Sequence, residues 1–332
     1  MELETTKHNF EKLQLYNYIK EAKVLIKIKK LKMKRMDSKK IFCFIGLVPV
    51  LLLYTYLRFV PILKTFYMSF FKWDLVSLNK PFIGFKNFYD MFSSKLFIKT
   101  LLDTSIIAFS VLIVIMPLSL LIANLLSQKI KFSSWFESFY FLPVIMPMVP
   151  ITVIWKWILD ADYGLLNYFI SIFGIESKAW LINANLAIIS VILITVWKNI
   201  GYNMLIFLVG IRGIPKDYYE AAIIDGANSY ARFRYITIPL LKPITVYVSV
   251  MTLIKSYNVF SQVYILASDV QGAPSHLVRV IVYDMIENGF RFYKMGYASA
   301  EAVVLFLIVF IITLIQIKLS NDNMFSTKKE LK

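Results

Sequence analysis

Charged residues divide the chain into long apolar stretches, and the lengths of these stretches predict its architecture. A helix needs about 20 mostly apolar residues to cross a bilayer, because it rises about 1.5 Å per residue. Six stretches meet this requirement with few or no charges inside them. We predict an all-α, polytopic membrane helical bundle with six transmembrane helices, at about 41–60, 103–128, 138–158, 184–211, 243–267 and 295–318. Three prolines in the third stretch predict a kink there: Pro143, Pro147 and Pro150.

The same pattern predicts three segments, which are a basic tail at 1–37, a transmembrane domain at 38–320 and a tail at 321–332. The first forty residues hold 12 Lys or Arg and 5 Asp or Glu. Three interpretations of this tail stay open: a basic helix on anionic lipid, a solvated tail, or a translation start at Met33 or Met36. We expect the first span to be a retained helix, because no small-residue cleavage site follows it.

Lys and Arg predict the orientation, because they concentrate on the cytoplasmic side of membrane proteins. With both termini cytoplasmic, that side holds 23 of them and the opposite side holds 11. The first tail accounts for the difference. We therefore expect a multi-pass protein of a bacterial plasma membrane with both termini in the cytoplasm.

The amino-acid composition excludes several classes of function. Hydrophobic residues make up 58% and charged residues 17%, against about 45–50% and about 25% in soluble domains. The single cysteine, Cys43, excludes an internal disulfide, and with His8 and His276 it makes a zinc site improbable. No phosphate-binding glycine loop is present. The net charge of +16 fits orientation and contact with membrane lipid. We expect no nucleic acid partner, no metal, no cofactor and no catalytic residue.

The loop between the fourth and fifth spans, Ile211 to Pro243, has a distinct pattern. It predicts a short helix, a break and a second short helix. Pro215 suits a first helical turn, and Asp217 with Glu220 resembles a capping box. Gly226 suits a sharp turn, because glycine tolerates positive φ. The loop also carries two further prolines that suit the end of the second helix and the start of the fifth span: Pro239 and Pro243.

This loop resembles the EAA loop of binding-protein-dependent ABC importer permeases. The family pattern is E-A-A, three residues, G, nine residues, then I-x-L-P, and here Ile238 stands in place of the leucine. The resemblance implies a cytoplasmic coupling helix that docks on an ATPase subunit, which binds the ATP and Mg. It assigns six residues to this coupling loop: Glu220, Ala221, Ala222, Asp225, Gly226 and Pro239.

Further segments between residues 38 and 318 resemble carbohydrate-type permeases, the subclass of the maltose and glycerol-3-phosphate importers. They are S-F-F-K-W-D-L, P-F-I-G-F-K-N-F, W-K-N-I-G-Y-N, G-Y-A-S-A and Q-G-A-P, in which Ala273 replaces a glycine. The resemblance implies a sugar or oligosaccharide as solute. It also implies three partners: a second homologous permease, an ABC ATPase dimer and an extracytoplasmic solute-binding protein.

Polar residues inside the fourth and fifth spans are candidates for the substrate path, because polar groups in lipid are costly. They are Asn199, Gly201, Tyr202, Asn203, Tyr257, Asn258 and Ser261. The resemblance places four of these residues at positions that line the sugar site: Gly201, Tyr257, Asn258 and Ser261. At the lining positions of the third span, however, this chain has the apolar residues Val144 and Met148. The alternative for each residue is hydrogen bonding between helices. Lys198 and Lys255 are expected to snorkel or to pair within the bundle.

Two rival classes of membrane protein fit the sequence less well. A membrane enzyme would need clustered acids or histidines, and the candidates are His276, Asp269 and Asp284. An ion-coupled secondary transporter would need intramembrane acids, and Glu301 is the one candidate. A nearer alternative is the same machinery for a glycerophosphodiester, a polyol, a peptide or another solute. We predict a transport subunit that is not an enzyme.

Overall fold

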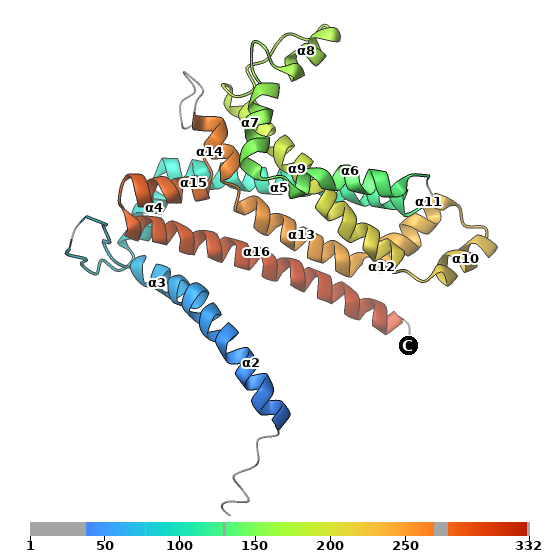
Figure 1. The fold of residues 1–332 in the computed structure, drawn as a ribbon, viewed down its shortest axis with the longest axis horizontal. Helices are drawn as coiled ribbons and strands as arrows, with labels where there is room; N and C mark the ends of the chain where they lie inside the picture. The colour runs from blue at the N-terminus through green and yellow to red at the C-terminus, as the bar shows by residue number, and fades with distance from the viewer. Residues whose placement is uncertain (1–37, 77, 129–130, 269–277, 331–332) are drawn as a thin grey trace, which may run out of the picture. The chain divides into compact units, whose positions relative to one another are not determined.

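The computed structural model describes residues 38–76, 78–128, 131–268 and 278–330. The tail at 1–37, the Q-G-A-P segment and His276 lie outside these ranges. The chain divides into two units, residues 1–64 and 65–332. In the described part, four helices are long and apolar enough to cross a membrane, or up to six if each of two bent helix pairs is one span. The secondary structure is almost entirely helical (Figure 1).

The first span is longer than its sequence prediction. It consists of α2 (Ser38–Tyr54), the π-helical turn η1 (Thr55–Phe59) and α3 (Val60–Met68), and it reaches Met68 instead of residue 60. No residue in its most apolar window is buried by the rest of the chain. Such a helix needs lipid or another subunit around it, because an apolar surface of this size is not stable in water.

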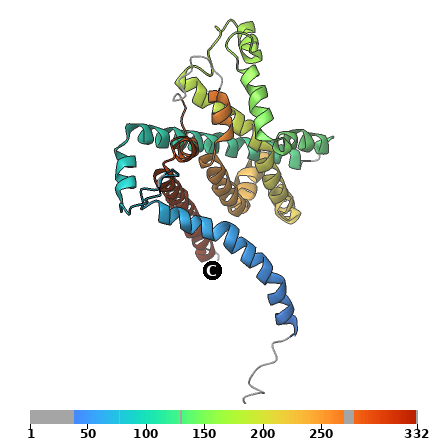
Figure 2. The same cartoon turned by 60° about the vertical axis from the view of Figure 1, so that its left-hand side comes forward.

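Four long helices form the bundle of the second unit (Figures 1 and 2). They are α5 (Lys95–Ser127), α9 (Ala184–Arg212), α13 (Lys242–Tyr257) and α16 (Met295–Glu330). Helix α9 packs along α5, and α13 packs against α5, α9 and α16. Helix α5 begins eight residues before the predicted start at 103, because the Ser94 hydroxyl accepts a hydrogen bond from the Phe97 amide and caps the helix there.

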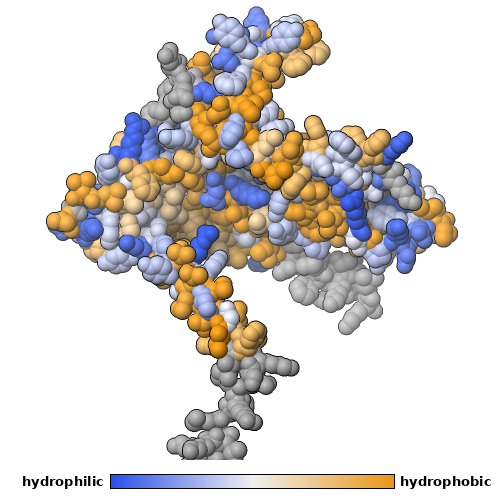
Figure 3. Space-filling view, in the orientation of Figure 1, coloured by the Kyte–Doolittle hydropathy of each residue, from blue (hydrophilic) through white to orange (hydrophobic). Residues whose placement is uncertain are grey.

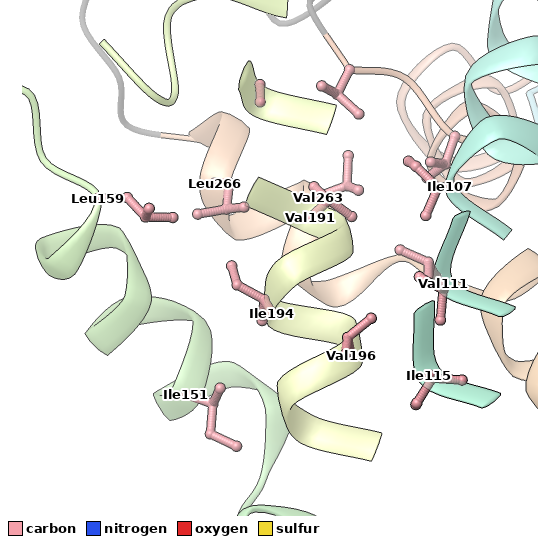
Figure 4. Close-up of a cluster of buried hydrophobic side chains, with 14 residues drawn as sticks. Ile107, Val111, Ile115, Ile151, Leu159, Val191, Ile194, Val196, Val263 and Leu266 are labelled. Carbon is pink, nitrogen blue, oxygen red and sulfur yellow. The ribbon is translucent and has the colours of Figure 1, made fainter. Parts of the chain in front are cut away.

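An apolar core joins the bundle to the segments around it (Figure 4). Ile107, Val111 and Ile115 of α5 line up at helical spacing and face Val196 of α9. Ile194 lies on the side of α9 that is turned toward α7 (Met148–Ile158). Residues beyond the bundle complete this cluster: Ile151, Leu159, Val259, Val263, Leu266, Val278 and Val280. The same contacts therefore hold both bent spans against α5 and α9.

The third span is broken, as the prolines predict. Helix α6 (Ser133–Ile145) and helix α7 (Met148–Ile158) meet at an angle of 100°. The two residues between them, Met146 and Pro147, have extended backbone. Figures 1 and 2 both show α7 running away from α6 at this bend. Proline lacks an amide hydrogen, so at this junction Pro147 leaves no donor without a partner.

The chain after α7 forms a short excursion around helix α8 (Leu165–Ile172). Buried Asn167 organises it. Its amide nitrogen donates to the carbonyls of Asp160, Ala161 and Lys178, and its oxygen accepts from the Trp180 indole. The Asn167 side chain thus donates hydrogen bonds to backbone carbonyls at both ends of the loop that contains α8.

The fifth span is also bent, by 67°, between the segment Ser229–Leu240 and the segment Lys242–Leu266. The second segment is interrupted again after α13, and α14 (Ser261–Ser268) follows. Two shorter elements, α15 (Ile281–Ile286) and the π-helical turn η3 (Glu287–Arg291), precede α16. Helix α4 (Lys86–Ser93) packs on α16.

We predict that Gly201→Val destabilises the bundle. A Cβ at Gly201 would overlap the backbone carbonyl of Tyr140 in α6, and backbone cannot move aside as a side-chain end can. Overpacking of this kind costs about 1–3 kcal/mol. We expect a melting temperature in mild detergent several degrees below the wild type.

The matched control is Gly46→Val, because a Cβ at Gly46 of α2 meets nothing within 4 Å. It should melt with the wild-type protein. Equal melting of the Gly201 variant and the wild type would contradict the close packing of α6 on α9.

Candidate coupling loop and substrate path

The loop between α9 and α13 contains the predicted pair of short helices. Helix α10 (Lys216–Ile224) begins directly after Pro215, and α11 (Ser229–Arg232) follows a turn. The predicted cap was wrong: α10 has no side-chain cap, and Asp217 lies within its first turn. The negative charge of Asp217 still complements the positive end of the helix dipole.

Gly226 makes the turn between the two helices. Its φ is +79°, a value that residues with a Cβ rarely adopt. The Ala227 amide donates to the Ala222 carbonyl at 2.8 Å and the Gly226 amide donates to the Ile223 carbonyl at 3.0 Å. These are the two bonds that close a helix with a glycine just beyond its end. The turn predicted at Gly226 is therefore confirmed, and Asn228 begins the next helix by accepting from the Ala231 amide at 2.8 Å.

The loop is tied together from within. The Tyr219 and Thr237 hydroxyls lie 2.9 Å apart and share a hydrogen bond between α10 and the π-helical turn η2 (Phe233–Thr237). The Arg232 guanidinium donates to the Ala227 carbonyl at 2.8 Å. Helix α12 (Ile238–Leu240) contains Pro239 and leads into α13. The two short helices are thus one compact piece.

The exposed surface of this piece lacks a partner in the described chain. No residue of α10 is buried, and Ile224 is 86% exposed. Exposed positions also include Glu220, Ala221, Asp225, Gly226 and Pro239, while Ala222 is half-buried. A helix with apolar residues exposed beside carboxylates and small residues is typical of a protein-protein contact.

A groove of about 850 Å³ connects this loop with the predicted path. It is lined by Tyr202 and Val209 of α9, by Pro215 and Tyr218 next to or in α10, and by further apolar residues. Gly210 of α9 also lines the groove, and its lack of a side chain lets the Ile244 side chain of α13 pack directly against α9. Elements from α6, α9, α10, α12 and α13 therefore meet in one place.

The predicted path residues separate into a buried and an exposed group. The Asn203 amide donates to the Thr252 hydroxyl at 3.1 Å, and the Tyr257 hydroxyl donates to the Ser105 hydroxyl at 3.2 Å. Asn203 and Tyr257 are 3% and 2% exposed, and both bonds join two helices. Gly201 is buried against α6. The contacts of these three residues match the alternative interpretation, in which they join helices of the bundle. A role in lining the substrate path stays a prediction for all seven residues named in the sequence analysis.

The more exposed group lies on α9, in the break after α13 and at the start of α14. Tyr202 and Ser261 are half-buried, and Asn258 is exposed with its amide donating to the Ile254 carbonyl at 2.7 Å. Asn199 is half-buried and donates to the Thr195 carbonyl at 2.8 Å. Figure 3 shows hydrophilic residues among apolar ones in the middle of the face that it draws.

Lys198 has a role that the sequence prediction left open. Its ammonium donates to the carbonyls of Pro143 at 2.9 Å, Val144 at 3.4 Å and Met146 at 2.7 Å. These carbonyls belong to the last turn of α6 and the break after it, where no amide of the helix remains to bond them. The sequence shows a lysine in the fourth span and clustered prolines in the third. Nothing in the pattern indicates that this lysine bonds the backbone beside those prolines.

A second polar cluster lies where α15 and η3 meet α16. The Arg279 guanidinium, 2% exposed, bonds Asp284 and Glu287, and Arg291 bonds Glu287 at 2.8 Å. Burial works to lower the pKa of Arg279, but the bonds to Asp284 and Glu287 outweigh it and raise that pKa. Glu301 accepts from the Asn288 amide at 3.1 Å.

A metal-binding group of three or more acidic, histidine or cysteine residues is absent from the described residues.

Comparison with known proteins decides the family. The family described as "binding-protein-dependent transport system inner membrane component" matches residues 115–322, more than half of the chain. The chain belongs to this family. It is therefore a permease subunit of a transport system and a multi-pass protein of the plasma membrane.

Individual relatives agree with this assignment. The permease is 32% identical to the probable ABC transporter permease protein YurN of Bacillus subtilis, over 89% of this chain and 99% of that protein. It is 31% identical to the arabinooligosaccharides transport system permease protein AraP of the same organism, over 86% and 90%. It is 26% identical to the trehalose/maltose transport system permease protein MalF of Thermococcus litoralis, over 86% and 95%.

The fold also matches a solved structure. A chain of a bacterial ABC transporter involved in the import of the acidic polysaccharide alginate superposes with a TM-score of 0.75 at 20% identity. The match covers 86% of the permease and 96% of that chain. It confirms the helical membrane fold, and it carries no information on the solute.

We predict that Lys198→Met weakens the permease at the α6–α7 break. The substitution leaves carbonyls without donors, and each unsatisfied buried group costs about 1–3 kcal/mol. We expect lower detergent stability and loss of transport in vesicles. Lys198→Arg keeps N–H donors at this position and should recover part of both.

The control is Lys64→Met, at an exposed lysine of α3. It removes the same charge from a span and should leave stability unchanged. A Lys198→Met protein as stable as this control would show that the three carbonyls do not need the ammonium.

Proposed function

We propose that the permease is one transmembrane subunit of an ATP-driven importer for a sugar or oligosaccharide. The observation that carries this proposal is the exposed α10–α11 loop, whose E-A-A pattern and Gly226 turn form a compact docking piece. The names of the relatives support a carbohydrate, since AraP is named for arabinooligosaccharides and MalF for trehalose and maltose. A glycerophosphodiester, a polyol or another solute on the same machinery is the alternative.

The partner of the loop is an ABC ATPase dimer. Ile224 supplies apolar area, Ala221 and Ala222 allow close approach, and the Glu220 and Asp225 carboxylates offer acceptors to basic or amide donors. The ATPase binds ATP and Mg, and the permease supplies the surface that moves with it. Closure of the ATPase dimer would then displace α10 and α11 as a rigid body, a hinge or shear movement.

Two further partners complete the importer. The exposed face with Tyr202 and Asn258 needs a cover, because polar residues at membrane depth are not stable against lipid. A second homologous permease supplies this cover and encloses the path. An extracytoplasmic solute-binding protein delivers the solute. This is supported by the similar alginate transporter, whose solved complex contains an alginate pentasaccharide-bound periplasmic protein.

The coupling role also sets the orientation. The loop must face the cytoplasm to meet an ATPase. With six spans, four helices precede the loop and two follow it, so both termini lie on the same side as the loop. The count of Lys and Arg supports the same arrangement.

We predict that Gly226→Asp abolishes docking of the ATPase and uptake of solute, while the chain still inserts in the membrane. An aspartate at φ +79° strains the turn, and its side chain projects from an exposed surface where a Cβ meets nothing within 4 Å. Copurification of the ATPase with the tagged permease measures docking.

Gly174→Asp is the matched control. Gly174 has φ +74° and equally open surroundings, but it follows α8 in another loop. It should keep the ATPase and transport. A Gly226→Asp permease that retains a full complement of ATPase and transports normally would overturn the coupling assignment.

We predict that mild-detergent purification of the native permease recovers an ATPase, a second permease and a binding protein, identified by mass spectrometry. Crosslinking before extraction should retain the binding protein, which contacts the complex transiently. Recovery of the permease alone under crosslinking would argue against an importer complex and would reopen the ion-coupled mechanism.

A further inference from the structure

Lys255 is a cation near the middle of the membrane with no carboxylate partner in the described chain. Its ammonium lies 3.7 Å from the centre of the Tyr202 ring. Tyr202 is one helical turn from Lys198, which stands at the centre of the 29-residue helix α9. Both lysines therefore lie at about the same depth. Neither lysine forms an ion pair within the described residues.

The two lysines differ in what they leave available. Lys198 directs its ammonium at three backbone carbonyls, so its N–H donors are used. Lys255 is exposed, and its described contact is the face of an aromatic ring. A cation on a ring face is stabilised by the ring quadrupole and keeps its N–H donors for another acceptor.

The acids of the neighbouring spans do not neutralise this charge. Asp103 of α5 and Glu301 of α16 are 6% and 0% exposed, while Lys255 is exposed. Glu301 accepts from Asn288, in the same region as the Arg279 cluster. The face around Lys255 therefore has a net positive charge at a depth where charge is costly, and such residues mark substrate paths.

We propose that the solute is a sugar with at least one negative charge, a carboxylate or a phosphate, and that Lys255 contacts this charge during passage. This inference rests on the proposed function and specifies its substrate class. Asn258 stands three residues from Lys255, on the same face, and is exposed. An amide beside an ammonium and a tyrosine ring suits an acidic sugar: the ammonium pairs with the anion, and the amide and the ring contact hydroxyls and C–H groups.

The first experiment identifies the charge of the native solute. The binding protein that copurifies with the complex is unfolded, and its released ligand is analysed by mass spectrometry. We expect a sugar with a carboxylate or a phosphate. A neutral sugar would overturn this inference and leave the proposed function intact, whereas a ligand that is not a sugar would overturn the proposed carbohydrate solute as well.

The second experiment tests Lys255 in the complete complex in proteoliposomes. Digalacturonate and glucose 6-phosphate serve as anionic probes beside the released ligand, and maltotriose and cellobiose serve as neutral ones. Lys255→Gln should lower uptake of the released anionic ligand, and of any anionic probe that the wild type carries, at least tenfold, or about 1.4 kcal/mol in the barrier. Lys255→Arg should retain most of it, because it keeps the charge.

Two readouts separate this role from a structural one. Lys255→Gln should retain the ATPase and the second permease on purification, and it should lower uptake of anionic solutes more than uptake of any neutral probe. Loss of the second permease would mean that Lys255 pairs with a carboxylate of that subunit, which overturns the inference. Uptake of an anionic solute at the wild-type rate by Lys255→Gln would also overturn it.

Discussion

A break in a transmembrane helix is the constraint on which the rest of this structure depends. In lipid, every backbone N–H and C=O group must find a partner within the protein. The α6–α7 junction interrupts its own ladder and turns the chain by 100°. Two features resolve the conflict. Prolines remove donors that would lack partners, and the Lys198 ammonium bonds the carbonyls that remain.

Helix α9 contacts α6 along the half of its length that runs from Lys198 to Arg212. Gly201, one turn from Lys198, lets the α6 backbone lie directly on α9. Arg212 at the end of α9 bonds Glu137 near the start of α6 at 2.6 Å. These contacts hold α6 and α9 together from the break to the coupling loop. In the proposed coupling mechanism, these two joined helices connect the loop with the break and with the predicted substrate path.

The sequence was sufficient for the helical membrane fold, the break in the third span and the turn at Gly226, because each follows from a local pattern. Charge spacing marks a span, clustered prolines mark a bend, and a glycine at a fixed distance from E-A-A marks a turn. Such local patterns do not predict contacts between segments that are distant in the sequence. The early start of α5 depends on one serine, Ser94, and the absence of a cap at Asp217 depends on Pro215. The bond from Lys198 to residues more than fifty positions away has no local signal.

The same limit explains why the polar residues of the spans were hard to assign. Composition cannot distinguish an amide that bonds a neighbouring helix from one that faces a solute, since both are polar residues in an apolar segment. Burial separates them. Asn203 and Tyr257 are used inside the chain, where they fix α13 against α9 and α5. Asn258 and Lys255 are exposed, and the Lys255 ammonium lies over the half-buried ring of Tyr202. A single permease therefore bonds some polar groups of its spans internally and leaves others exposed on one face, and in the proposed importer that face contacts the second subunit and the solute.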